Sequence, residues 1–200
     1  MKYMYCLGSS YDAWVLADEA WEDQARRTWA CRGCDFPKPM TREIDIYLDP
    51  AHNEWPLKLT IDRSVRVTVG FARHDFLEAI GYALIERYFH LGRLFWGYAE
   101  GRDMQDFCTF HSKGNPVYIR GNPKSQYRRC DQCGRMIYVA FGRKYVLARD
   151  LREDVPIYES SSNKFLMHEG LADRLRKGRW KRLAVEKIPV LEHPADGLEF

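Results

Sequence analysis

The chain has 200 residues, 46% of them hydrophobic and 14% aromatic, with a formal net charge of +3. This composition excludes a disordered chain, and the length fits one domain over residues 1–200. The sequence contains no apolar stretch long enough to span a membrane, and its first residues lack the pattern of a signal peptide. We therefore expect a cytoplasmic protein without membrane contact, in which thiols stay reduced.

Charge is unevenly distributed along the chain. Residues 1–100 carry 12 Lys and Arg against 15 Asp and Glu, whereas residues 101–200 carry 19 against 13. The C-terminal half is therefore basic, with a net charge of +6 against −3 in the N-terminal half. A basic half is compatible with an acidic protein partner, with a nucleic acid, or with solubility alone.

The first expected elements are a strand over residues 1–7 and a region over residues 11–29 that combines helix with irregular chain. Residues 31–39 read as a tight turn followed by a proline-rich turn. Valines that alternate with polar residues then predict a strand over residues 64–70.

The clearest helical pattern covers residues 75–91. Asp75 is the expected N-cap, with Glu78 as the reciprocal partner of a capping box. Gly92 is the expected stop signal. One apolar stripe runs along this segment at spacings of three and four residues: Leu77, Ile80, Leu84, Tyr88 and Leu91.

The next segment, residues 101–124, contains many Gly, Asn and Pro residues. It predicts a loop with a short strand over residues 117–119. Residues 136–141 and 144–148 then predict a hairpin that turns at Gly142.

The chain is expected to close with a strand over residues 164–167, a helix over residues 168–177 and a strand over residues 183–191. In this helix Leu171 and Leu175 are expected to face the core. Strands and helices are mixed without regular β-α-β alternation, so the predicted class is α+β, a single mixed domain.

Two pairs of cysteines have the spacing of metal-binding turns, which we call knuckles: Cys31 with Cys34, and Cys130 with Cys133. Each knuckle points two thiolates at one metal ion, and two knuckles complete a tetrahedral four-sulfur site. Because 95 residues separate Cys34 from Cys130, the metal would join distant parts of one domain. We therefore predict one structural zinc ion bound by these four cysteines.

The residues around the two knuckles differ. Gly134 follows the second pair, where a glycine can adopt the positive φ that turns the chain away beneath the metal. Asp35 stands at the equivalent position after the first pair, which instead carries Gly33 inside the knuckle. The alternatives to zinc are thiols without metal, or a redox-active CxxC, which would lie at a strand-to-helix junction.

Cys108 and His111 are spaced as a further CxxH pair that could supply substitute ligands. We instead expect Cys108 to be a small core residue and His111 to lie in a polar loop. Cys6, inside a predicted strand, is expected to be a core residue as well.

Between residues 120 and 187 the chain carries 17 Lys and Arg against 8 Asp and Glu. Tyr127 stands beside two arginines next to the second knuckle, and Trp180 stands between basic residues after the last predicted helix. Aromatic and basic side chains together can bind single-stranded nucleic acid. The competing interpretation is a solvated face whose long side chains cover apolar surface.

The two widely spaced CxxC pairs, the second reading Cys-x-x-Cys-Gly-Arg, resemble those of the double-CXXCG motif proteins, a family that includes immunity proteins of swarm-inhibition toxin systems. The segments from Phe165 to Arg176 and from Leu183 to Val190 resemble the closing strand–helix–strand of that family. The resemblance implies a cytoplasmic protein that binds and neutralises a cognate protein toxin, and it implies no catalytic residues.

The sequence contains no Gly-rich phosphate loop, nucleophile elbow or HExxH motif. A four-thiolate zinc also leaves no position for a reactive water. The leading hypothesis is therefore a non-enzymatic immunity protein, whose basic C-terminal half would steer an acidic toxin. The alternatives are a zinc-knuckle protein that binds nucleic acid and an enzyme whose site has no recognised motif.

Overall fold

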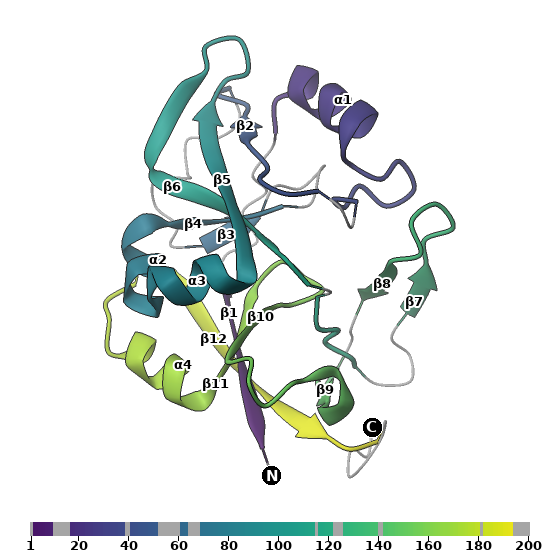
Figure 1. Ribbon diagram of the computed structural model, residues 1–200, viewed down its shortest axis with the longest axis vertical. Helices are drawn as coiled ribbons and strands as arrows, with labels where there is room; N and C mark the ends of the chain where they lie inside the picture. The colour runs from purple at the N-terminus through teal and green to yellow at the C-terminus, as the bar shows by residue number, and fades with distance from the viewer. Residues whose placement is uncertain are drawn as a thin grey trace.

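The computed structural model describes residues 2–9, 17–38, 41–51, 61–63, 69–114, 116–121, 126–139, 142–180 and 182–193. These residues form a mixed arrangement of four α-helices and several sheets, as the predicted α+β class requires (Figure 1). Within the described ranges, no helix is both long and apolar enough to cross a bilayer.

The first sheet has five strands in the order β10-β11-β1-β12-β9. Its central strand β1 lies antiparallel to β11 and β12, and β9 joins the edge in parallel. The strands are β1 (Tyr3–Ser9), β9 (Val146–Leu147), β10 (Ile157–Glu159), β11 (Phe165–His168) and β12 (Leu183–Leu191).

The second sheet also has five strands, in the order β2-β5-β6-β4-β3. A long antiparallel hairpin of β5 and β6 forms its centre, and β2 lies parallel to β5. The strands are β2 (Ile46–Leu48), β3 (Ile61–Arg63), β4 (Gly70–Arg73), β5 (Phe89–Trp96) and β6 (Arg102–Ser112).

A separate two-stranded sheet consists of β7 (Gln126–Arg129) and β8 (Met136–Val139). Figure 1 shows this hairpin at the side of the molecule, with its turn near the chain that follows α1. The helices are α1 (Glu19–Thr28), α2 (His74–Ile80), α3 (Tyr82–Tyr88) and α4 (Glu169–Arg176), and a short 3₁₀ turn, Ala148–Asp150, follows β9.

The largest cluster of buried side chains joins both five-stranded sheets to α2, α3 and α4. Its centre is aromatic: the ring of Phe165 stacks on that of Phe110, with centroids 4.2 Å apart, and Phe89 packs edge-on against Phe165. On the other face of the second sheet, Trp21 and Ala25 of α1 join a second buried cluster. The two clusters therefore place α1 on one face of the second sheet and α2, α3 and α4 on the side of the other face.

Several predicted elements are confirmed. Strands β1, β11 and β12 lie where the sequence predicted strands, and β12 has the predicted bounds. The closing helix is α4, in which Leu171 and Leu175 are buried. In the region over residues 11–29, the described part contains α1. The strand predicted over residues 64–70 lies almost entirely outside the described residues, which begin again at 69.

The predicted helix over residues 75–91 is wrong in length and in its cap. Two short helices replace it, because Gly81 between them has a φ of 110° that no helix accommodates. Arg73 is the N-cap residue, and Asp75 lies in the first turn, where its carboxylate binds the Arg73 guanidinium. That pair lowers the pKa of Asp75. Residues 89–96 form the strand β5 instead of the end of a helix.

Two further predictions are wrong. Residues 101–124, predicted as mostly loop, contain the eleven-residue strand β6. The predicted strand over residues 117–119 is reduced to a single bridge between Val117 and Ser160. The predicted hairpin over residues 136–148 does not form either, because β8 pairs with β7 and β9 pairs with β12.

Candidate metal centre

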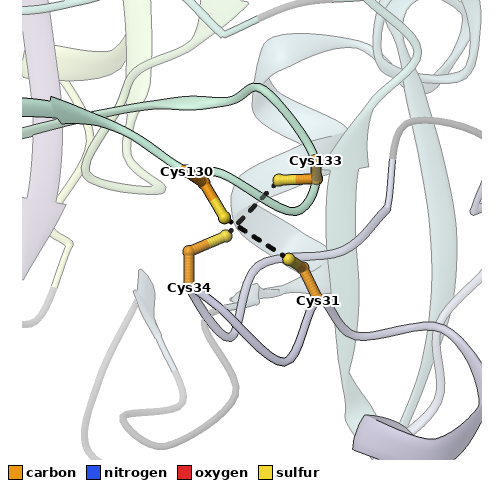
Figure 2. Close-up of side chains that lie close together, drawn as sticks. All are labelled: Cys31, Cys34, Cys130 and Cys133. Atoms are coloured by element: carbon orange, nitrogen blue, oxygen red, sulfur yellow. Dashed lines mark hydrogen bonds between the residues drawn. The ribbon is translucent and has the colours of Figure 1, made fainter.

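Four of the six cysteines meet at one point of the structure, although their two pairs are far apart in the sequence. The sulfur atoms of Cys31, Cys34, Cys130 and Cys133 all lie within 4.8 Å of one another. Figure 2 shows the four side chains pointing towards a common centre. The two CxxC pairs therefore converge as predicted, and their thiols form a possible metal site.

The two pairs reach this point from different elements. The first follows α1 directly, because Trp29 is the C-cap of that helix and Cys31 comes two residues later. The second pair forms the turn between β7 and β8. Cys31 and Cys130 are buried, whereas Cys34 and Cys133 are half-buried. A metal here would fasten the end of α1 to a hairpin that has no other sheet partner among the described strands.

Backbone hydrogen bonds give both knuckles the same geometry. The amide of Cys31 donates to the carbonyl of Phe36 at 2.9 Å, and the amide of Cys130 donates to that of Arg135 at 2.9 Å. In each knuckle the accepting carbonyl belongs to the fifth residue after the first cysteine. The same two residues also meet across the site, where the Arg135 guanidinium lies 4.0 Å from the centre of the Phe36 ring. The knuckles are thus near-equivalent halves in direct contact.

Asp35 adopts the conformation that the sequence suggested for a glycine. Its φ is 58°, against 72° for Gly134 at the equivalent position of the second knuckle. In both places the amide donates to the carbonyl of the first cysteine of its pair, at 2.7 and 2.8 Å. Left-handed backbone costs a residue other than glycine about 1 kcal/mol, and aspartate tolerates it better than most residues. Arg26 of α1 holds the Asp35 carboxylate at 3.0 Å.

The thiol of Cys130 differs in acidity from those of Cys34 and Cys133. Backbone amides of Cys133 and Gln132 donate to the sulfur of Cys130 and lower the pKa of its thiol to about 7. Burial raises the pKa of Cys34 and of Cys133 above the ordinary thiol value. A metal ion would therefore bind one thiol that ionises readily, that of Cys130. It would have to displace the protons of Cys34 and Cys133.

Gly33 lies at a close approach between the knuckles. A Cβ at this position would lie 2.9 Å from the sulfur of Cys130 and 3.3 Å from the side chain of Gln132. Because metal–sulfur distances tolerate only a few tenths of an ångström, we expect Gly33→Ala to weaken metal binding about tenfold, like other changes next to metal ligands. Competition with a chromophoric chelator measures this affinity.

Gly170→Ala is the matched control for this prediction. A Cβ at Gly170, in the first turn of α4, would have no atom within 4 Å. We expect this variant to keep its metal affinity unchanged. Equal affinities in the wild type and Gly33→Ala would show that the close contact with Cys130 does not matter. The sequence shows that a glycine lies inside the first CxxC pair. It does not show that this glycine faces the sulfur of Cys130, which belongs to the other knuckle.

The remaining cysteines lie away from the metal centre. Cys108 is buried in β6, as predicted for a core residue, and burial raises the pKa of its thiol to about 12. Cys6 is likewise buried in β1. The prediction of a polar loop for His111 is wrong: it is 8% exposed, in β6, with Nδ1 3.6 Å from the buried carboxylate of Glu159.

Many of the basic side chains between residues 120 and 187 have partners within the protein. Arg120 pairs with Asp150, Lys144 with Glu186, and the Arg176 guanidinium lies over the Tyr5 ring. Trp180 packs edge-on against Phe76 and donates from Nε1 to the carbonyl of Leu175. Its half-buried ring therefore packs against the core of the fold. The side chain of Tyr127 lies outside the described part of the chain.

No protein-family model matches this chain, and no curated protein resembles it significantly.

Proposed function

We propose that the chain is a non-enzymatic immunity protein, held together by one structural zinc ion, that binds and neutralises a cognate protein toxin. The observation that carries the proposal is the convergence of the two distant CxxC pairs at one four-sulfur site. This convergence agrees with the resemblance to the double-CXXCG motif proteins, which depends on the same two pairs. The closing unit β11-α4-β12 agrees with the strand–helix–strand on which the rest of that resemblance depends.

Zinc is the metal that best suits this donor set. Four zinc–sulfur bonds of about 2.3 Å place neighbouring sulfurs about 3.8 Å apart in a tetrahedron. The Cys31–Cys130 and Cys34–Cys133 sulfur separations are both 3.6 Å. They are far longer than a disulfide bond of about 2.05 Å. Sulfur ligands select soft or borderline ions, and four protein ligands leave a tetrahedral zinc no position for water. Because the four cysteines would fill every coordination position of the zinc ion, its role would be structural.

One zinc ion per chain is the expected result of elemental analysis on protein purified without added metal. The four thiolates bind zinc far more tightly than single surface ligands can, so the ion should survive gel filtration. Titration with a thiol reagent should then release zinc in proportion to the cysteines modified. A folded chain that contains no metal after purification would contradict the structural role.

The immunity function predicts a stable complex with a toxin encoded beside this gene. Co-expression should restore growth to a host that the toxin alone kills, and the two proteins should co-purify in moderate salt. A protein complex with a buried interface resists salt, whereas nucleic-acid binding falls steeply as salt rises. No rescue, together with salt-sensitive retention of RNA or DNA, would favour the nucleic-acid alternative.

A further inference from the structure

A cleft of about 800 Å³ lies between α1 and the second sheet. Its lining comes from five parts of the chain: α1 with its C-cap, the segment before and within β2, His74 at the start of α2, strand β5 with the turn that follows it, and strand β6. This volume is in the range of binding sites for small molecules and side chains. In Figure 1 these elements lie at the opposite end of the molecule from β9 and the end of β12.

The walls of the cleft are fixed by hydrogen bonds between these segments. Asp18, the N-cap of α1, accepts from the amide of Tyr98 at 3.2 Å, and its own amide donates to the carbonyl of Tyr47 at 2.8 Å. The Tyr98 hydroxyl contacts the side chain of Gln24 in α1. The cleft is therefore preformed, and a ligand would not have to order it.

The chemistry of the lining favours a cation. Glu43, Asp45 and Asp103 place three carboxylates around the cleft, and Arg93 offsets one of them by binding Asp45 at 2.8 Å. Within the described residues, Glu43 and Asp103 make no ion pair, and both are exposed. The lining thus presents three carboxylates against the single guanidinium of Arg93, which pairs with Asp45 and also attracts Asp103.

Aromatic rings complete the lining. Trp29, Tyr47 and Tyr98 are half-buried there, and the last two pack edge-on with centroids 4.9 Å apart. Aromatic faces beside carboxylates are the usual environment of bound ammonium and guanidinium groups. Arg93 shows this mode of cation binding within the protein itself. Its guanidinium binds Asp45 and lies 4.9 Å from the centre of the Phe95 ring.

We propose that this cleft binds a cationic side chain, an arginine or lysine, presented by the protein partner. The proposal rests on the immunity function for the identity of that partner, the cognate toxin. The bound group would lie against the aromatic rings with its charge between Glu43 and Asp103. This contact would place acidic side chains from both halves of the sequence, instead of the basic residues between 120 and 187, against the toxin.

The first experiment uses arginine amide as the probe and citrulline amide, whose side chain is an uncharged isostere of the arginine side chain, as the comparison. Titration of the isolated protein is followed through the indole N–H signals of Trp21 and Trp29 in a nuclear magnetic resonance spectrum, since both residues line the cleft. Saturable shifts with arginine amide alone are expected. They should disappear in the double variant Glu43→Gln, Asp103→Asn. Equal shifts with both amides, or an unchanged response in that variant, would overturn the proposal.

The second experiment measures the dissociation constant of the toxin complex. Neutralising both carboxylates should weaken the complex about tenfold or more, because each would lose a charged partner. The control variant, Glu153→Gln with Glu192→Gln, removes two exposed carboxylates beside the first sheet and should leave the constant unchanged. A toxin complex unaffected by the cleft variant would overturn the assignment of the cleft to the toxin. If no toxin complex forms while arginine amide still binds selectively, the immunity function fails and the cation site stands.

Discussion

Replacing Cys130 with serine is expected to remove zinc and to destabilise the whole fold. Structural zinc contributes apparent free energies of about 10 kcal/mol in small zinc domains, which is comparable with the net stability of a typical domain. Serine leaves three thiolates and a weak hydroxyl ligand, so most of that contribution is lost. The effect should be largest in the β7–β8 hairpin, because a two-stranded sheet is marginal by itself. Denaturant unfolding and zinc content, measured on the same samples, test both expectations.

Cys108→Ser is the matched control for this prediction. Cys108 is buried among the apolar side chains of the largest cluster, so serine should cost about 1–3 kcal/mol for an unsatisfied hydroxyl and leave the zinc content unchanged. Addition of a chelator should then destabilise the wild type and Cys108→Ser equally, but not Cys130→Ser. Equal losses of stability and zinc in the two serine variants would refute the assignment of the ligands.

The sequence predicted the metal centre better than the strands around it. A CxxC pair is a local signal, so residue type and spacing alone indicated Cys31, Cys34, Cys130 and Cys133. What the sequence could not provide is the contact between the knuckles. The rings and charges that link them, such as Arg135 over Phe36, join residues 99 positions apart.

Strand β6 was missed because its second half is buried on both faces and therefore lacks alternation. Phe107 faces the cluster beside α1, whereas Cys108 and Phe110 face the cluster between the sheets, so consecutive residues are all apolar or buried. Without a period of two, the flanking Gly, Asn and Pro residues dominated the interpretation. The helix prediction was wrong near Leu91 for a related reason. The apolar residues at spacings of three and four in this segment also fit a buried strand.

The predicted hairpin over residues 136–148 shows the limit of turn signals. Gly142 does adopt a positive φ of 67°, as the turn required. The two flanking strands nevertheless belong to different sheets, because the second knuckle pairs β8 with β7 and the edge of the first sheet takes β9. Turn chemistry fixes where a chain reverses, and long-range packing decides which strands then pair.

Phe165→Ala is expected to be the most destabilising change outside the metal centre, at about 3–5 kcal/mol. Phe165 is fully buried, and its ring contacts Phe76 of α2, Phe89 of β5 and Phe110 of β6. Removing it opens a cavity at the point where both sheets and a helix meet. Denaturant unfolding of the zinc-bound protein measures the loss, and Phe165→Leu, which fills more of the space, should lose distinctly less.

Phe165→Ala also tests whether the aromatic core and the metal centre contribute independently to the stability of the protein. None of the four cysteines belongs to the buried cluster around Phe165, so the two contributions to stability should add. Phe165→Ala should therefore keep one zinc ion per chain, and a chelator should destabilise it by the same amount as the wild type. A zinc-free Phe165→Ala protein, or a chelator effect that vanishes in this variant, would mean that the metal centre and the aromatic core form a single cooperative unit. In that case the zinc would support the packing between the two sheets, in addition to fastening α1 to the β7–β8 hairpin.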